Sequence, residues 1–219
     1  MNVDMCNRYE QKGSVSQIRA LAQRMGRQLR TTSQTDNLPP HESVYPDQDA
    51  PVIINTEDGG LELTMMRWGF PPIPEEKTPI TNIRNLKSKW WKDVNKEYIT
   101  SKAYRCLVPF TAFAEPARDS TWFAVPDIEI ATFAGFWCPF KGERLMGQPG
   151  QKRRVRQSAD WRLFAFLTTE ANDIVRPIHE KAMPVILFEP AEQTEWLNGE
   201  EVSLRLQKPL LNEQLRIRA

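Results

Sequence analysis

Apolar residues recur at intervals of three and four over residues 15–29, and this period predicts a helix with one buried face. Farther along the chain the pattern changes to short apolar or alternating runs, which indicate strands. Residues 52–54 and 61–68 are two such runs on either side of a glycine-rich turn at residues 58–60, so they predict a β-hairpin. The chain is therefore expected to combine a helix with a sheet.

The rest of the chain is expected to be mostly strand. Further strands are expected at residues 106–109, 112–115, 122–125, 130–137, 163–167 and 184–188, and a short helix is expected from Pro190. Several short strands in succession favour a closed or nearly closed sheet. Asn82 is expected near a loop-to-helix junction. Residues 141–158 are basic, contain glycine and lack a hydrophobic period, so they predict a mobile loop between strands.

Length and composition favour a globular chain. No repeat or second domain is indicated, so residues 1–219 are expected to form one domain around one core. Apolar residues make up 40% and charged residues 26%, with a formal net charge of +1. Because the net charge is close to zero, a nucleic-acid site would have to come from a local basic surface.

Three cysteines, Cys6, Cys106 and Cys138, are too few and too scattered for a disulfide framework or a zinc module. A reducing cytoplasmic location fits this usage, and neither a metal nor an organic cofactor is expected. No apolar run approaches the roughly 18 residues of a membrane span, so no membrane partner is expected.

Three residues are candidates for chemistry. His179 lies between a proline-containing turn and a predicted strand, a place that suits either a site residue or a satisfied, partly buried histidine. Glu115 follows an apolar run, so it is either a pocket carboxylate or the solvent-side end of a strand. Cys6 follows Met5, and as an N-terminal residue it would carry an amine and a thiol with ordinary pKa values near ~8 and ~8.5.

Seven sequence blocks carry a resemblance to a known family. In chain order they are Met5-Cys6-Asn7-Arg8-Tyr9, Met66-Arg67-Trp68-Gly69-Phe70, Asn82-Ile83-Arg84, Cys106-Leu107-Val108-Pro109 followed by Glu115, Ala134-Gly135-Phe136-Trp137, Thr168-Thr169-Glu170-Ala171-Asn172, and Ile178-His179-Glu180-Lys181-Ala182-Met183-Pro184-Val185-Ile186-Leu187. Together they resemble the SOS response-associated peptidase family over nearly the whole chain. The resemblance implies an α+β fold built on a curved, barrel-like, mostly antiparallel sheet with flanking helices.

The resemblance also implies a function in DNA repair. Cys6, exposed by autoproteolytic removal of residues 1–5 or by a start at Met5, would form a thiazolidine cross-link with abasic sites in single-stranded DNA. Asn82, Glu115 and His179 would line the same pocket. A monomer that associates with the nucleoid when it is bound to DNA is expected.

The chemistry of the reaction suits these residue types. Ring opening and imine formation both move protons, which a histidine can shuttle, and a carboxylate in a partly apolar pocket can hold the amine. The Asn82 amide can hydrogen-bond the sulfur or a sugar oxygen without adding charge.

DNA contacts are predicted from cationic and aromatic side chains. The candidates are Arg8, Arg67, Trp68 and Arg84, with the alternative that Trp68 belongs to the core and the arginines are solvated or ion-paired. The pair Trp90-Trp91 is either a second stacking platform or part of a helix that buries both indoles.

The chain departs from the family pattern at several positions. Residues 1–4 precede Met5, Asn7 stands where the family usually has glycine, and Pro116 stands where it usually has tryptophan. Asn85-Leu86 replaces a polar pair.

Two other functions stay open. One is a cysteine hydrolase acting in trans, with Cys6 and His179 as an ion pair oriented by Glu115. The other is a non-catalytic module that binds single-stranded DNA.

Overall fold

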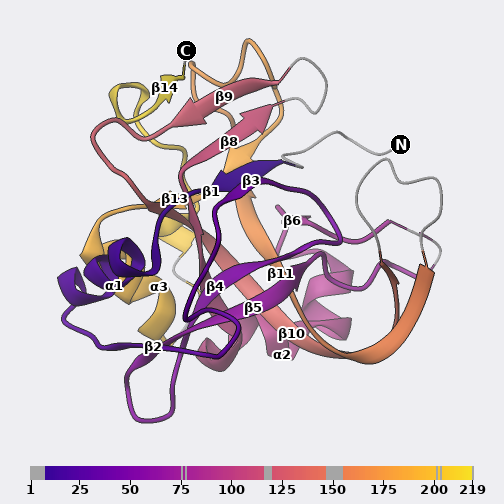
Figure 1. The fold of residues 1–219 in the computed structure, drawn as a ribbon. Coiled ribbons are helices and arrows are strands. Elements are labelled where there is room, and N and C mark those ends of the chain that lie inside the picture. The colour runs from indigo at the N-terminus through magenta and orange to yellow at the C-terminus, as the bar shows by residue number, and fades with distance from the viewer. Residues whose placement is uncertain are drawn as a thin grey trace.

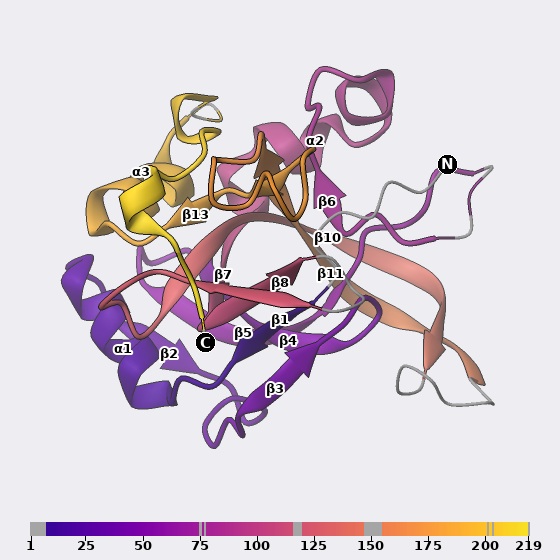
Figure 2. The same ribbon diagram turned by 90° about the horizontal axis from the view of Figure 1, so that it is seen from above.

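Five strands pair edge to edge into a closed ring, because β5 bonds to β4 on one side and to β11 on the other (Figures 1 and 2). The ring strands are β4 (Asp49–Asn55), β5 (Leu61–Trp68), β7 (Arg105–Phe110), β10 (Ala131–Met146) and β11 (Val155–Thr169). Four of the five pairings are antiparallel, and β5 with β11 is the parallel one. The computed structural model describes residues 8–74, 76, 78–115, 120–146, 155–200, 202 and 204–218. The predicted barrel-like α+β fold is confirmed.

Side chains on the ring strands alternate between two apolar clusters. In β4, Ile53 belongs to the cluster that includes helical residues such as Leu21 and Trp196. Its neighbours Val52 and Ile54 belong to the other cluster, which the second sheet completes. Both faces of the ring strands are therefore buried in the body of the molecule.

A second, five-stranded sheet lies across one end of the ring (Figure 2). Its strands, in spatial order, are β14 (Arg216–Ile217), β9 (Thr121–Ala124), β8 (Ala112–Glu115), β1 (Tyr9–Gln11) and β3 (His41–Val44). The first strand of the chain is thus an interior strand of this sheet. Tyr9 anchors it, since its buried ring meets Trp68 edge-on with the centroids 5.2 Å apart.

Short strands and helices complete the fold. The strands are β2 (Leu29–Thr31), β6 (Asn82–Ile83), β12 (Met183–Pro184) and β13 (Ile186–Leu187). The helices are α1 (Val15–Arg24), α2 (Lys96–Thr100) and α3 (Pro190–Asn198), with a π-helical turn η1 (Trp90–Val94) and 3-10 turns η2 (Lys102–Tyr104), η3 (Leu204–Leu206) and η4 (Asn212–Gln214). Among the described residues, no helix has the length and apolar character needed to cross a membrane.

The first helix is shorter than the apolar period predicts. Ser14 begins it with a capping box to Gln17, and Met25 caps its end. The following Gly26 has φ +71°, a left-handed conformation that ends helices. Leu29, expected in the helix, belongs to β2 instead.

The expectation of a mobile loop at residues 141–158 is wrong for the part that the structure describes. Residues 141–146 and 155–158 are paired strand, for example Glu143 with Ser158 and Met146 with Val155. Residues 147–154 lie outside the described residues. The hairpin of β10 and β11 runs out beyond the ring (Figure 1).

Candidate functional site

Glu115 and His179 lie next to each other. Glu115 is the last residue of β8, and only 1% of its side chain is exposed. His179 precedes β12, and its Nδ1 lies 3.8 Å from Glu115 Oε2. This distance is too long for a hydrogen bond but short for a charge interaction inside a protein. The structure therefore has a buried carboxylate directly beside this imidazole.

Hydrogen bonds fix both the imidazole and the turn that carries it. Its Nδ1 lies 2.8 Å from the carbonyl oxygen of Ala182, and because a carbonyl only accepts, Nδ1 is the nitrogen that donates. The backbone N–H of His179 donates to the carbonyl of Val175. The Asn172 side chain in turn accepts from the Val175 N–H at 3.0 Å. Nε2 is therefore the nitrogen that can exchange a proton with a substrate.

Asn82 lies in a strand, so the predicted loop-to-helix junction is wrong. It belongs to β6 and pairs with Phe166 of β11 in a parallel register. Its side chain is 5% exposed, and its Nδ2 donates to Thr81 Oγ1 at 2.8 Å. The β-bridge holds the amide on a rigid element rather than on a flexible loop.

A hydrogen bond ties the Asn82 segment to the His179 segment. The exposed Arg84 guanidinium donates to the carbonyl of Lys181, two residues after His179. Both segments also pair with the end of β11, where Ile83 is the register partner of Leu167 and Pro184 is the register partner of Thr168. The structure thus brings these two segments together at one end of β11, with Glu115 of β8 against the second.

Cys6 and Asn7, like Pro116, lie outside the described residues. The other two cysteines are buried in the core. Burial raises the pKa of the Cys138 thiol to about 12, and burial raises the pKa of Cys106 further still. Because the thiolate is the nucleophile, neither is reactive near neutral pH.

Trp68 belongs to the core, which corrects its assignment as a DNA contact. It is fully buried, and its ring stacks on Phe164 and Phe166 with centroids 6.4 and 5.1 Å apart. Its Nε1 donates to the carbonyl of Thr81 at 3.1 Å. No face of this indole is open to a base.

Arg67 is buried and ion-paired. Its Nε lies 3.3 Å from Asp47 Oδ1 and its Nη1 lies 3.5 Å from Asp49 Oδ1. Its Nη2 donates to the carbonyl of Leu145 at 2.7 Å. The Asp47 carboxylate also accepts from Arg144 Nε at 3.0 Å, so one acid joins β5 to the hairpin of β10 and β11. The predicted DNA contact is thus a structural cation, and the sequence pattern gave no signal for Asp47 or Arg144.

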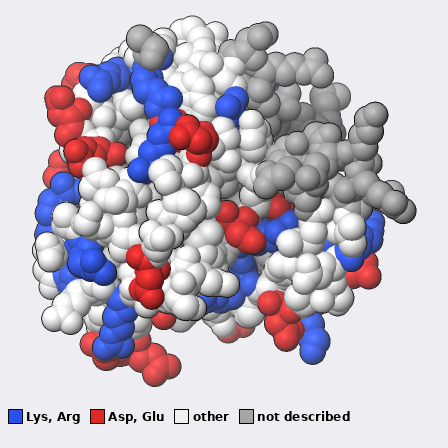
Figure 3. Space-filling view, in the orientation of Figure 1, with Lys and Arg blue, Asp and Glu red and all other residues white. Residues whose placement is uncertain are grey.

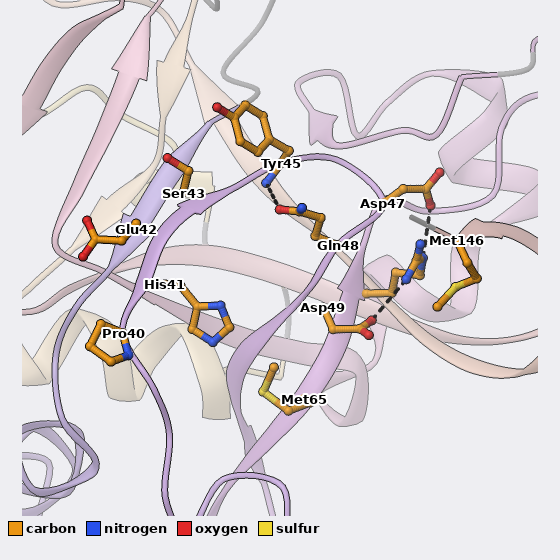
Figure 4. Close-up of a pocket in the computed structure, with 11 residues that line it drawn as sticks. Pro40, His41, Glu42, Ser43, Tyr45, Asp47, Gln48, Asp49, Met65 and Met146 are labelled. Atoms are coloured by element: carbon orange, nitrogen blue, oxygen red, sulfur yellow. Dashed lines mark hydrogen bonds and ion pairs between the residues drawn. The ribbon is translucent and has the colours of Figure 1, made fainter. Parts of the chain in front are cut away.

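A groove of about 750 Å³ runs past these groups (Figure 4). Its lining includes His41, Ser43 and Tyr45 at one end and Asp49, Arg67 and Met146 at the other. The acids Glu42, Asp47 and Asp49 outnumber the one arginine in the lining, so this groove does not favour a phosphate backbone.

Arg8 is half-buried and directly precedes β1. Its carbonyl accepts from the Ala114 N–H at 3.0 Å. Its guanidinium donates to Ser43 Oγ through Nε at 3.0 Å and Nη2 at 2.9 Å.

The Trp90-Trp91 pair packs against the core and does not form an exposed stacking surface. Trp91 is 5% exposed and meets Phe70 edge-on at 5.5 Å, while Trp90 packs partly buried against the same cluster. The expectation of a helix that buries both indoles is therefore confirmed for Trp91, while Trp90 is half-buried in the same π-helical turn. Among the described residues, no group of three or more histidine, cysteine or acidic side chains is placed to hold a metal ion.

The ring, the second sheet and the Glu115–His179 pair define an α+β barrel protein with a neighbouring carboxylate and imidazole where its two sheets meet. The chain belongs to the SOS response associated peptidase (SRAP) family, whose model matches residues 5–218.

Solved structures support the fold. A protein from Bacteroides thetaiotaomicron is 21% identical with a TM-score of 0.66, over 96% of this chain and 90% of that chain. A protein from Bordetella bronchiseptica is 19% identical with a TM-score of 0.65, over 96% and 97%. A phage-related protein from the same organism is 17% identical with a TM-score of 0.58, over 96% and 92%. A search of curated proteins gave no match.

Proposed function

We propose that this protein cross-links itself to abasic sites in single-stranded DNA through Cys6. The observation that carries the proposal is the contact between the shielded Glu115 carboxylate and His179, at the end of the strand that neighbours β1. Cys6 precedes Arg8 by two residues, and two residues of chain span at most about 7 Å. The carbonyl of Arg8 bonds to Ala114, the neighbour of Glu115. We therefore propose that Cys6 lies beside the pair.

Elimination supports Cys6 as the nucleophile. Cys106 and Cys138 are buried thiols that burial holds in the neutral form. The family match begins at residue 5, so residues 1–4 precede the part of the chain that the family shares. Hydrolysis of the Met5–Cys6 bond consumes one water and leaves Cys6 with a free amine.

The cross-linking step balances with the loss of one water. The Cys6 amine adds to the aldehyde carbon of the ring-opened sugar, and the resulting carbinolamine loses water to give an imine. The sulfur then adds to the same carbon, and a proton moves to nitrogen, which closes the thiazolidine. No oxidant, metal or cofactor takes part in these steps.

Each residue of the site has a proposed role. His179 Nε2 moves protons during ring opening. Glu115 orients the amine and accepts its proton. Asn82 hydrogen-bonds the sulfur or a sugar oxygen as a neutral group.

A denaturing gel tests the proposal. Purified protein is mixed with a labelled single-stranded oligonucleotide that carries one abasic site, and a slow band that survives denaturation is expected. Cys6→Ala should abolish the band, whereas the matched control Cys138→Ala should keep it. An oligonucleotide with a tetrahydrofuran analogue has no aldehyde and should give no band.

The same assay separates the two rival functions. Acetylation of the terminal amine blocks imine formation and should abolish the band, whereas a hydrolase acting in trans needs no free amine. A module that only binds DNA would give no denaturation-resistant band in any sample. A band that persists in Cys6→Ala would contradict the proposal.

A further inference from the structure

The C-terminal segment lies against both chain segments that carry candidate site residues. Directly after η3, the Gln207 side chain hydrogen-bonds the stretch of chain that follows Asn82. Three residues later, the carbonyl of Leu210 accepts from Asn172, which precedes the turn at residues 173–178. This turn leads directly to His179. Gln207 and Asn172 thus connect the end of the chain to the two site segments.

The Gln207 amide bridges two backbone carbonyls that cannot bond to each other. Strands β6 and β11 pair in parallel as far as Ile83 and Leu167, and the residues that follow these two are Arg84 and Thr168. Gln207 Nε2 donates to the carbonyl of Arg84 at 2.8 Å and to the carbonyl of Thr168 at 2.9 Å. Because an amide nitrogen has two N–H groups, one side chain satisfies both oxygens and holds the two strands together beyond their last pair.

Asn172 holds the turn that carries His179. Only 6% of Asn172 is exposed, and its Oδ1 accepts from the N–H groups of Ile174 at 3.2 Å and Val175 at 3.0 Å. The carbonyl of Val175 then accepts from the His179 N–H at 2.8 Å. The Asn172 Nδ2 donates to the carbonyl of Leu210 at 3.1 Å. One side chain therefore closes the turn and bonds it to the C-terminal segment.

Both links set the positions of groups that must act on one substrate. A displacement of about 1 Å in a reacting group can slow a reaction by about 100-fold. His179 lies in neither a helix nor a strand, so its distance from Glu115 depends on the bonds that hold its turn. Asn82 lies in a strand of only two residues, so the bond through Gln207 extends a short pairing.

We propose that Asn172 and Gln207 are positioning residues, which hold the His179 segment and the Asn82 segment in place at the end of β11. The inference rests on the proposed function and deepens it, because it adds two residues that act through His179 and Asn82. Both added residues are neutral. Basic and acidic side chains are interspersed on the face that Figure 3 shows, and substitution of a neutral residue leaves this charge pattern unchanged. The effect is therefore expected on the rate of cross-linking and not on the affinity for DNA.

Two measurements separate the rate from the affinity. Single-turnover gels with saturating protein give the rate of cross-linking to an abasic oligonucleotide, and fluorescence anisotropy with the tetrahydrofuran oligonucleotide gives the affinity. Asn172→Ala and Gln207→Met are each expected to slow cross-linking about 10- to 100-fold and to change the affinity by less than about 2-fold. Methionine keeps the length of the Gln207 side chain and removes both N–H donors.

Each variant has a matched control. Asn55→Ala removes an amide that donates to the carbonyl of Leu197 at the other end of the ring strands. Gln214→Ala removes a glutamine of the same C-terminal segment, whose Oε1 accepts from the N–H of Leu211. Both controls should keep the wild-type rate.

The tautomer of His179 gives a readout that needs no DNA. The chain has two histidines, so protein with isotope-labelled histidine gives two sets of imidazole signals in NMR spectra. Wild type should show His179 with its proton on Nδ1, whereas Asn172→Ala should show exchange between the two tautomers. Asn172→Ser should restore the Nδ1–H form, because a serine hydroxyl can accept from the same N–H groups. The His41 signals should not change.

The outcomes separate this inference from the proposed function. Mixed tautomers in Asn172→Ala, in a protein that forms no covalent band, would uphold the role of Asn172 and reject the cross-linking proposal. A wild-type rate of cross-linking in both Asn172→Ala and Gln207→Met would overturn this inference alone. Thermal melts show whether each variant is folded in the assay. If Asn172→Ala unfolds, the comparison of Gln207→Met with Gln214→Ala still decides whether the C-terminal segment positions the site.

Discussion

The tautomer of His179 decides which nitrogen can serve a reaction. Nδ1 donates to the Ala182 carbonyl, with the nitrogen and oxygen 2.8 Å apart, which leaves Nε2 as the nitrogen that can exchange a proton. Glu115, 1% exposed, lies beside the ring, with its Oε2 3.8 Å from Nδ1. Asn82, Glu115 and His179 were expected to share a pocket, and among the described residues Glu115 and His179 are in contact.

We predict that His179→Gln slows cross-linking by about 100-fold or more, as expected when general acid–base catalysis is lost. Single-turnover gels over time measure the rate. The chain has only two histidines, and the other provides the matched control. Burial lowers the pKa of His41, so this residue is neutral at pH 7, and His41→Gln should keep the wild-type rate. Equal rates for wild type and His179→Gln would remove His179 from the mechanism.

Trp68 shows where reasoning from single residues failed. It lies two positions after Met66 in a strand, so both side chains point to the same buried face. The alternation of side chains along this strand therefore indicated a core position for Trp68, whereas the family motif indicated a DNA contact. Arg67 was assigned wrongly from sequence, because its acidic partners are about 20 residues away: Asp49 faces Arg67 across the β4–β5 hairpin, and Asp47 lies in the turn before β4.

At the scale of elements, the β10–β11 hairpin depends on a buried ionic cluster. Asp47 accepts from Arg144 of β10 and from Arg67 of β5, and both arginines are at most 5% exposed. The outer part of the hairpin was not predictable, because residues in a ribbon open to solvent on both sides need no hydrophobic period. Its strands were recognisable only where they join the ring.

We predict that Asp47→Asn lowers the free energy of unfolding by about 3–5 kcal/mol, since it leaves buried guanidinium groups without their shared carboxylate. Asparagine tolerates the left-handed backbone at this position, where φ is +64°. The loss of stability therefore reports the contribution of the Asp47 charge and not backbone strain. Asp160→Asn, in an exposed pair with Lys141 on the same hairpin, should change stability by less than about 1 kcal/mol. Urea unfolding gives both values, and equal midpoints for the two variants would contradict this role.

Strand β1 carries a pH-dependent contribution at Glu10. Burial alone would raise the pKa of Glu10, but hydrogen bonds and charges from Arg218 and Lys12 outweigh it and lower the pKa from the ordinary 4.5. A carboxylate with a lowered folded pKa stabilises the fold above the unfolded value, and this contribution is lost as the pH falls through the folded pKa.

We therefore predict that Glu10→Gln costs about 2 kcal/mol at pH 7, typical for lost hydrogen bonds to a charged group. The difference from wild type should shrink as the pH falls below 4.5. Thermal melts across this range measure it. A difference that is constant down to pH 2 would show that Glu10 contributes through packing alone.

At the scale of the whole molecule, the second sheet places the start of the chain at the end of the ring. β1 pairs with β8 and β3, so the segment that follows Cys6 is held between strands from later in the sequence. The hydrophobic pattern predicted most of the ring strands. It could not predict that β5 and β11 close the ring in parallel, because a pairing across about 95 residues leaves no local signal.

Intact-mass spectrometry of the protein before and after reaction with an abasic oligonucleotide tests whether the Cys6 amine reacts. For a protein expressed from Met1, we predict a free mass that lacks residues 1–5 and an adduct mass equal to protein plus oligonucleotide less one water. A full-length free protein, or an adduct that keeps residues 1–5, would show that no Cys6 amine was available and would rule out the thiazolidine.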